Sequence, residues 1–135
     1  MSVRLHHVQV GCPTGGEDDA RRFWVEGLGM TEVAKPAPLA GRGGVWFRAY
    51  DGPAADGRVV AEVHVGVEDP CAPPRRAHPA LLLDDEGALE ATGERLRGLG
   101  FEVDDRERAT FPGYLRLHAR DAHGNRVELL AADPA

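Results

Sequence analysis

The sequence predicts an α+β fold made of two βαβββ modules in succession. The prediction rests on an internal repeat: His7 and His78 lie 71 residues apart, and so do the triplets Gly27-Leu28-Gly29 and Gly98-Leu99-Gly100. Between each histidine and its triplet lies a segment of helical periodicity, and strand-like segments follow each triplet. Because a solenoid needs roughly three or more repeats, two long copies indicate duplicated supersecondary units.

The composition is that of one small globular domain. The chain has 135 residues, 42% hydrophobic and 28% charged, which is room for one core and not for two independent ones. The formal net charge is -6 and Lys35 is the only lysine, which argues against a nucleic-acid partner, a lysine Schiff base and a phosphate-loop lysine. We therefore expect no nucleic-acid partner.

Nothing in the sequence indicates a membrane or secretory protein. No apolar run approaches the roughly 20 residues that cross a bilayer, and residues 1–10 lack the charged start and apolar stretch of a signal peptide. Cys12 and Cys71 do not amount to a disulfide framework. We expect a cytoplasmic protein with no membrane partner.

The first module, at about residues 4–67, begins with a strand at 5–10 that ends in a Pro- and Gly-containing turn. Acidic residues at 17–19 suit the positive end of a helix, whose apolar face is formed by Ala20, Phe23, Trp24 and Leu28. Either glycine of the first triplet can end this helix. The remaining expected elements are strands at 30–33, 45–50 and 58–67, and a flap-like loop at 35–44 that is rich in Pro, Ala and Gly.

The second module, at about residues 78–131, follows a proline-rich connector at 68–77 and repeats the same order. A strand at 79–83 precedes a helix that opens at 84–86 and buries Leu89, Leu96 and Leu99. A turn at 121–125, which contains Gly and Asn, joins the last two strands. The three strands after the helix are expected at 101–103, 114–119 and 126–130.

Strand alternation predicts which side chains share a face. In each module the apolar set packs under the helix, which places His6 on the helix side. We expect each mixed sheet to be curved, with its helix on the convex side and the polar faces of the two modules enclosing a concave site. Such a concentration of ionisable groups is costly unless they are solvated or bind something, and imidazole with carboxylate is the usual ligand set for Zn, Fe, Mn, Co or Ni. The polar face collects His7, Gln9, Glu62, His64, His78, Arg116, His118 and Glu128.

These features resemble the vicinal oxygen chelate superfamily, which includes glyoxalase I, extradiol dioxygenases and the fosfomycin and bleomycin resistance proteins. Residues 5–10, Leu-His-His-Val-Gln-Val, and the helix that ends at the first triplet are similar to the family's opening. Residues 121–129, Asp-Ala-His-Gly-Asn-Arg-Val-Glu-Leu, resemble its closing motif, with Ala122 in place of the common proline. The resemblance runs from about Leu5 to Leu130 and implies a single glyoxalase-like domain.

In metal-dependent members of the superfamily, the ligands come from the first, fourth, fifth and eighth strands. The resemblance implies His7, His78 and Glu128 for three of these positions. For the fourth strand, His64 between Val63 and Val65 and Glu62 between Ala61 and Val63 both fit, and we favour His64. The implied cofactor is a divalent metal ion (Zn, Ni, Co, Mn or Fe), which acts as Lewis acid and template.

The resemblance also implies the function. We favour a metal-dependent lyase or isomerase of glyoxalase type that acts on a small oxygenated substrate. The alternatives are a metal-free protein that sequesters a drug, as bleomycin resistance proteins do, and a dioxygenase or thiol transferase of the same superfamily. Glu128 is the expected catalytic base and the protein is expected to be a homodimer. The expected substrate-binding residues are Gln9, Trp46, His118 and Arg116, the last for an anionic group.

Overall fold

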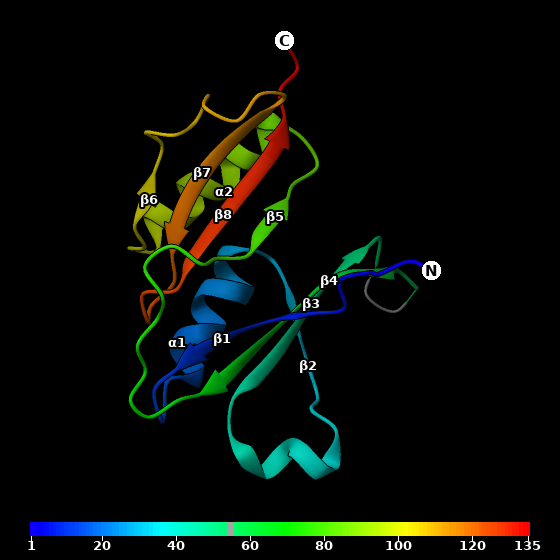
Figure 1. Cartoon of the computed structure of the whole chain (residues 1–135), viewed down its shortest axis with the longest axis vertical. Helices are drawn as coiled ribbons and strands as arrows, with labels where there is room; N and C mark the ends of the chain where they lie inside the picture. Colours follow the sequence, from blue (N-terminus) through cyan, green and yellow to red (C-terminus); the bar gives the residue numbers. More distant parts are fainter. Residues whose placement is uncertain (54–55) are drawn as a thin grey trace. The chain divides into compact units, whose positions relative to one another are not determined.

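The computed structural model describes residues 1–53 and 56–135 (Figure 1). The chain forms two compact units, Met1–Ala72 (unit 1) and Pro73–Ala135 (unit 2). Each unit contains one four-stranded mixed sheet together with its own helical segment, so the predicted α+β fold class is confirmed. None of the described helices is long and apolar enough to span a membrane.

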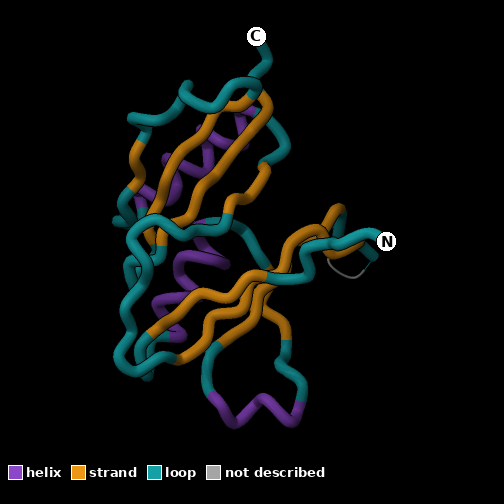
Figure 2. The backbone as a smooth tube through the Cα atoms, in the orientation of Figure 1, coloured by secondary structure: helices purple, strands orange, loops and turns teal. Residues whose placement is uncertain are grey.

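In unit 1 the strand order is β1-β4-β3-β2, with β1 and β4 parallel and the other neighbours antiparallel. The backbone in Figure 2 shows the short 3-10 helix η2 within the loop that joins β2 to β3. The elements are β1 (Val8–Cys12), α1 (Glu17–Arg21), the π-helix η1 (Arg22–Gly27), β2 (Thr31–Val33), η2 (Ala37–Arg42), β3 (Val45–Asp51) and β4 (Arg58–Val67).

The core of unit 1 lies between its helical segment and the apolar face of the sheet. Phe23 and Trp24 are fully buried, and the Trp24 ring stacks on Phe47 of β3 with 6.5 Å between centroids. The sequence predicted one continuous α-helix here. The structure instead widens into η1, where the Leu28 amide donates to the carbonyl of Phe23, five residues earlier, at 3.0 Å.

In unit 2 the strand order is β5-β8-β7-β6, with β5 and β8 parallel and the other neighbours antiparallel. The N-terminus of its helix is capped by Asp85, whose carboxylate accepts a hydrogen bond from the Ala88 amide at 2.8 Å. Leu89 and Leu96 are fully buried on the helix face that packs on the sheet. The elements are β5 (Ala80–Leu82), α2 (Glu86–Gly98), β6 (Val103–Asp104), β7 (Tyr114–Arg120) and β8 (Arg126–Ala132).

The first strand begins later than the sequence predicted, and this changes the placement of His6. The ladder between β1 and β4 starts at Val8, opposite Val63, so His6 and His7 precede the strand. Alternation in a strand therefore does not apply to them, and the prediction that His6 faces the helix side is wrong: both histidines are exposed and lie beside each other, with 2.9 Å between their Nδ1 atoms.

Candidate functional site

The polar face of unit 1 is formed by neighbouring side chains of β3 and β4. The antiparallel register pairs Trp46 with His64 and Arg48 with Glu62. Because directly paired residues of adjacent strands project from the same face, these four side chains are neighbours. Glu62 and His64 are nevertheless buried, at 7% and 5% exposed. Two ionisable groups are therefore held out of water on the face opposite the helices.

Hydrogen bonds fix both of these buried groups. The Arg48 Nε donates to Glu62 Oε1 at 2.6 Å, and Glu62 Oε2 lies 2.7 Å from His64 Nε2. Burial alone would raise the pKa of Glu62, but the hydrogen bonds from His64 and Arg48 outweigh it and lower that pKa. Burial lowers the pKa of His64 against the attraction of Glu62, so its imidazole is neutral at neutral pH, which is the form that binds metals.

The His64 ring is also held between two other rings. Trp46 stacks on it with 3.7 Å between centroids and 1° between planes, and His7 stacks at 4.0 Å and 18°. The ring orientation is thereby restrained from both sides, while Glu62 occupies Nε2. Among the described residues, Nδ1 of His64 has no hydrogen-bond partner, which leaves that nitrogen as the available ligand atom.

A second group of possible metal ligands in unit 1 includes His6, which the sequence predicted on the helix side of the sheet. One ligand atom from each of His6, His7 and Glu62 lies within 4.8 Å of the other two. Strand parity excluded His6 from the polar face, and that argument failed because the strand starts after it. The adjacent pair His6-His7 before a β-rich run is the only signal in the sequence that points to this grouping.

The polar face of unit 2 contains a compact group of two imidazoles and one carboxylate. The register pairs His118 of β7 with Glu128 of β8. His78 precedes β5, and its Nε2 lies 2.8 Å from Glu128 Oε1, while His118 Nε2 lies 3.6 Å from the same oxygen. One ligand atom of each residue lies within 4.8 Å of the others, and Arg116 Nη1 lies 3.5 Å from Glu128 Oε2.

Electrostatics in this group favour a neutral imidazole beside a carboxylate. Burial, followed by the nearby charge of Arg126, lowers the pKa of His118. Burial alone would raise the pKa of Glu128, but the hydrogen bond from His78 and the charges of His118 and Arg116 outweigh it and lower that pKa. At neutral pH the group therefore offers the neutral imidazole of His118 and the ionised carboxylate of Glu128, donor types that divalent transition metals prefer.

A buried nitrogen in unit 2 supports the same interpretation. His118 Nε2 is inaccessible to solvent and has no hydrogen-bond partner among the described residues. A buried polar atom without a partner is costly, so a missing ligand or ion is a physical reason for its position. The donor set fits a divalent metal ion beside Glu128, and the unpartnered His118 nitrogen is available to that ion or to a ligand bound next to it.

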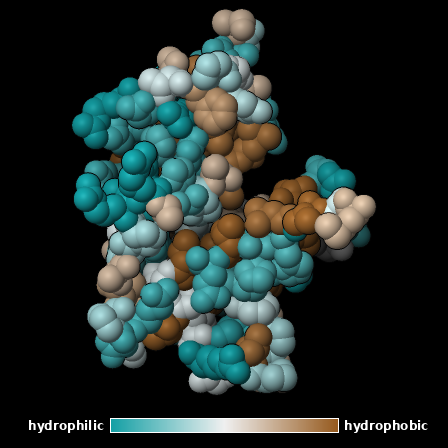
Figure 3. Space-filling view, in the orientation of Figure 1, coloured by the Kyte–Doolittle hydropathy of each residue, from teal (hydrophilic) through white to brown (hydrophobic). Residues whose placement is uncertain are grey.

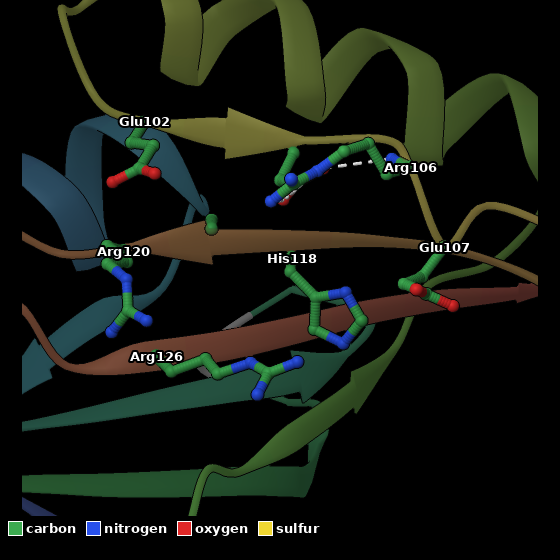
Figure 4. A pocket seen from close by; sticks show the side chains of 8 residues that line it. Glu102, Arg106, Glu107, His118, Arg120 and Arg126 are labelled. Atoms are coloured by element: carbon green, nitrogen blue, oxygen red, sulfur yellow. Dashed lines mark hydrogen bonds and ion pairs between the residues drawn. The ribbon is translucent and has the colours of Figure 1, made fainter. Parts of the chain in front are cut away.

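A pocket of about 410 Å³ opens on unit 2 beside His118. Its walls come from the segment around β6, from β7 and from the start of β8, and Figure 4 shows charged side chains of both signs around the His118 ring. The sequence placed His118 on the polar face, but the acidic and basic residues of the β6 segment were not predicted as part of a site. The lining residues are Glu102, Asp104, Arg106, Glu107, His118, Ala119, Arg120 and Arg126.

Three further residues that the sequence predicted to bind substrate occupy different environments. Gln9 is exposed on β1 and its register partner is His64, whereas Trp46 is half-buried with one face covered by the His64 ring. Arg116 donates to the Glu107 carbonyl and to Thr110 Oγ1, at 3.1 and 2.7 Å, in addition to its contact with Glu128. Their roles toward a substrate stay predictions.

The strand registers relate the two units position by position. In unit 1, Gln9 of β1 pairs with His64, and in unit 2 the residue 71 positions later, Ala80, pairs with Glu128. His64 and Glu128 are therefore equivalent positions of the two modules, just as His7 and His78 are. The ligand set predicted from the sequence consists of these two equivalent pairs. Because it draws on both units, it stays a prediction.

Comparison with known proteins adds the family. Residues 4–129 match the family described as the Glyoxalase/Bleomycin resistance protein/Dioxygenase superfamily. A Bacillus anthracis protein assigned to the glyoxalase family is 34% identical, with a TM-score of 0.79 over 98% of this chain and 100% of that chain. A search of curated proteins found no match.

Two more distant structures share the fold. The fosfomycin resistance protein FosX from Listeria monocytogenes is 15% identical, with a TM-score of 0.72 over 99% of this chain and 97% of that one. A glyoxalase/bleomycin resistance protein from a Streptomyces species is 21% identical, with a TM-score of 0.61 over 92% and 98% of the two chains. With the family match covering nearly its whole length, the chain belongs to the glyoxalase/bleomycin resistance protein/dioxygenase superfamily.

Proposed function

We propose that the protein is a metal-dependent lyase or isomerase that acts on a small oxygenated substrate. The observation that carries this proposal is the group formed by His78, His118 and Glu128, in which two imidazoles and a carboxylate approach within 4.8 Å and one buried imidazole nitrogen has no hydrogen-bond partner. Two histidines and one carboxylate are a donor set typical of catalytic Zn, Mn, Fe, Co or Ni sites.

The proposed ligands are His78 and Glu128, together with His7 and His64 at the equivalent positions of the first module, while His118 is proposed to lie beside the ion and face the substrate. Glu62 then has another role: its carboxylate is hydrogen-bonded to Nε2 of His64 and orients the ring, as outer carboxylates do for metal-bound histidines. A bound divalent ion supplies Lewis acidity and a template for two neighbouring oxygens of the substrate.

Glu128 is the proposed base, and its present contacts make its carboxylate less basic. The hydrogen bond from His78 and the charges of His118 and Arg116 lower its pKa, so Glu128 is a weak base while these contacts persist. It becomes more basic only if they loosen. His118 is a second candidate for moving a proton, because it is neutral at neutral pH and its Nε2 has no hydrogen-bond partner among the described residues.

The test is a titration of the chelator-treated protein with Co²⁺, whose visible absorption reports ligand number and type. We expect Glu128→Gln to weaken binding by more than the about 10–100-fold that loss of an outer partner costs, because the amide removes the charged ligand. His123→Ala is the matched control: this histidine lies in the turn between β7 and β8, outside both groups, and its loss should leave Co²⁺ affinity unchanged.

Equal Co²⁺ affinity of Glu128→Gln and the wild type would contradict the proposed site. If the wild type binds no metal but binds planar drugs tightly, the sequestering function of the bleomycin resistance proteins replaces the proposed one. Full turnover by Glu128→Gln on a substrate found for the wild type rules out Glu128 as the base.

A further inference from the structure

Two arginines lie side by side in the wall of the pocket of unit 2 (Figure 4). The antiparallel register pairs Arg120 of β7 directly with Arg126 of β8. Like charges at directly opposed positions destabilise a sheet, so a negative charge beside this pair would be stabilising. Arg120 donates one N–H, from Nη1, to the Gly124 carbonyl at 3.0 Å. The Arg126 guanidinium makes no hydrogen bond or ion pair with any residue in the described ranges 1–53 and 56–135.

None of the three acidic residues that line the pocket, Glu102, Asp104 and Glu107, forms an ion pair with Arg120 or Arg126 within the described part of the chain. Asp104 forms a two-pronged contact with Arg106, at 2.9 Å to Nε and 2.5 Å to Nη2. The Glu107 carboxylate accepts a hydrogen bond from Thr110 Oγ1 at 2.7 Å and lies 3.8 Å from Arg116. In Figure 4 the Arg126 side chain extends on the side of the His118 ring away from Arg106 and Glu107. The pocket therefore holds a guanidinium without an acidic partner.

The third polar group of the pocket is the buried imidazole of His118. The His118 side chain is 9% exposed, lines the pocket, and carries the Nε2 that has no hydrogen-bond partner among the described residues. The pocket thus combines the Arg126 guanidinium, which has no hydrogen-bond partner among the described residues, the Arg120 guanidinium, of which one N–H is hydrogen-bonded, and the buried Nε2 of His118. Planar guanidinium groups bind oxyanions through paired N–H donors, so this combination suits an oxyanion.

Arg116, the arginine that the sequence favoured for an anion, is less suited to this role. Its Nε donates to the Glu107 carbonyl, its Nη2 to Thr110 Oγ1, and its Nη1 lies 3.5 Å from Glu128. Its guanidinium also lies 5.6 Å from the centre of the Phe111 ring. These contacts commit all three nitrogens to holding the 105–113 loop and Glu128 in place.

We propose that the pocket binds the anionic group of a small substrate, with Arg126 as the main contact, Arg120 as the second, and His118 beside them. That the bound anion belongs to a substrate rests on the proposed function, whereas the anion site itself is argued from the residues of unit 2 alone. Arg126 precedes Glu128 by two residues on the same face of β8, a spacing of about 7 Å along the strand. The substrate class is therefore a short carboxylate or phosphonate whose neighbouring oxygens lie a few bonds from its charge.

The experiment uses two probes, acetate and methylphosphonate, with the full chain as purified and again after chelator treatment. The NMR signals of the arginine Nε–H groups are followed at physiological salt, where non-specific surface binding is screened. We expect saturable shifts of the Arg126 signal in both preparations, and at least about 10-fold weaker probe binding in Arg126→Gln, because a fork of charged donors is removed. The probe that binds more tightly identifies the anionic group.

Two variants make the result specific. Arg97→Gln removes an exposed arginine in the last turn of α2, which does not line the pocket, and should bind both probes as the wild type does. Arg126→Lys keeps the charge but loses the fork, and should bind more weakly than wild type yet better than Arg126→Gln. Absence of saturable binding in the wild type, or wild-type affinity in a folded Arg126→Gln, overturns the anion site. Because the chelated protein is used, that outcome is independent of metal binding.

Discussion

Glu62 and His64 are two ionisable residues that the fold buries side by side on one strand. They make a direct hydrogen bond and belong to a chain that continues to Arg48, while Trp46 and His7 cover the two faces of the imidazole. Such a fully connected arrangement restrains the ring and leaves Nδ1 for a ligand. It is the basis for proposing His64 as the ligand and Glu62 as its orienting partner, a choice that the sequence alone left open.

This assignment is tested by comparing His64→Ala with Glu62→Gln. If His64 is the ligand and Glu62 its orienting partner, Glu62→Gln should weaken Co²⁺ binding by about 10–100-fold, whereas His64→Ala should weaken it further. Calorimetric titration of both chelator-treated variants gives the comparison, with near-ultraviolet circular dichroism as the control for folding. A greater loss in Glu62→Gln than in His64→Ala would reverse the roles.

At the residue scale, the sequence predicted which strand positions face the polar side and not what they contact. Alternation placed Glu62, His64, His118 and Glu128 on the correct face, because a period of two follows directly from strand geometry. It could not show that the donors of Arg116 are taken by the neighbouring loop. That information depends on the path of residues 105–113, which contain no periodic pattern.

At the scale of elements, the close packing of α2 on its sheet depends on Gly93. A Cβ added there would meet Leu117 Cδ1 at 2.8 Å, and Leu117 is itself buried in β7. Gly98, at the end of the same helix, has nothing within 4 Å of the corresponding position. Neither glycine has a positive φ, so the two positions differ mainly in the space that a methyl group would find.

We therefore expect Gly93→Ala to be less stable than Gly98→Ala by about 1–3 kcal/mol, the usual cost of inserting a methyl group into a packed core. Comparing the two variants offsets much of the helix propensity that alanine gains over glycine. Urea unfolding followed by circular dichroism measures both free energies of unfolding. Equal stability of the two variants would show that α2 can move away from β7 without cost.

The order of the elements was predictable, and the deviations from it have local causes. The repeat of the histidine and the Gly-Leu-Gly triplet gave the βαβββ order twice, and β4 was predicted with its observed bounds, Arg58–Val67. The π-helix η1 was not predicted, because an apolar face of period 3.6 does not distinguish one wide turn from a regular one. β1 starts at Val8 because β4 pairs with it only from Val63 onward.

At the scale of the whole molecule, unit 1 exposes an apolar patch near the N-terminus. Val3 and Leu5 are 88% and 82% exposed, and Val59 and Val60 at the start of β4 are 41% and 55% exposed. Figure 3 shows hydrophobic residues gathered in this region of the surface. Exposed apolar side chains that cluster in this way are typical of surfaces that a partner covers, which agrees with the predicted homodimer.

Native mass spectrometry of the purified protein tests the central claim most directly, because one spectrum gives both the number of chains and the number of bound metal ions. We predict a dimer that carries one divalent ion per chain, that loses both ions on treatment with chelator, and that lacks them in His78→Ala while His123→Ala retains them. A wild-type protein that takes up no divalent metal, or a His78→Ala protein that carries the full complement, would contradict the account.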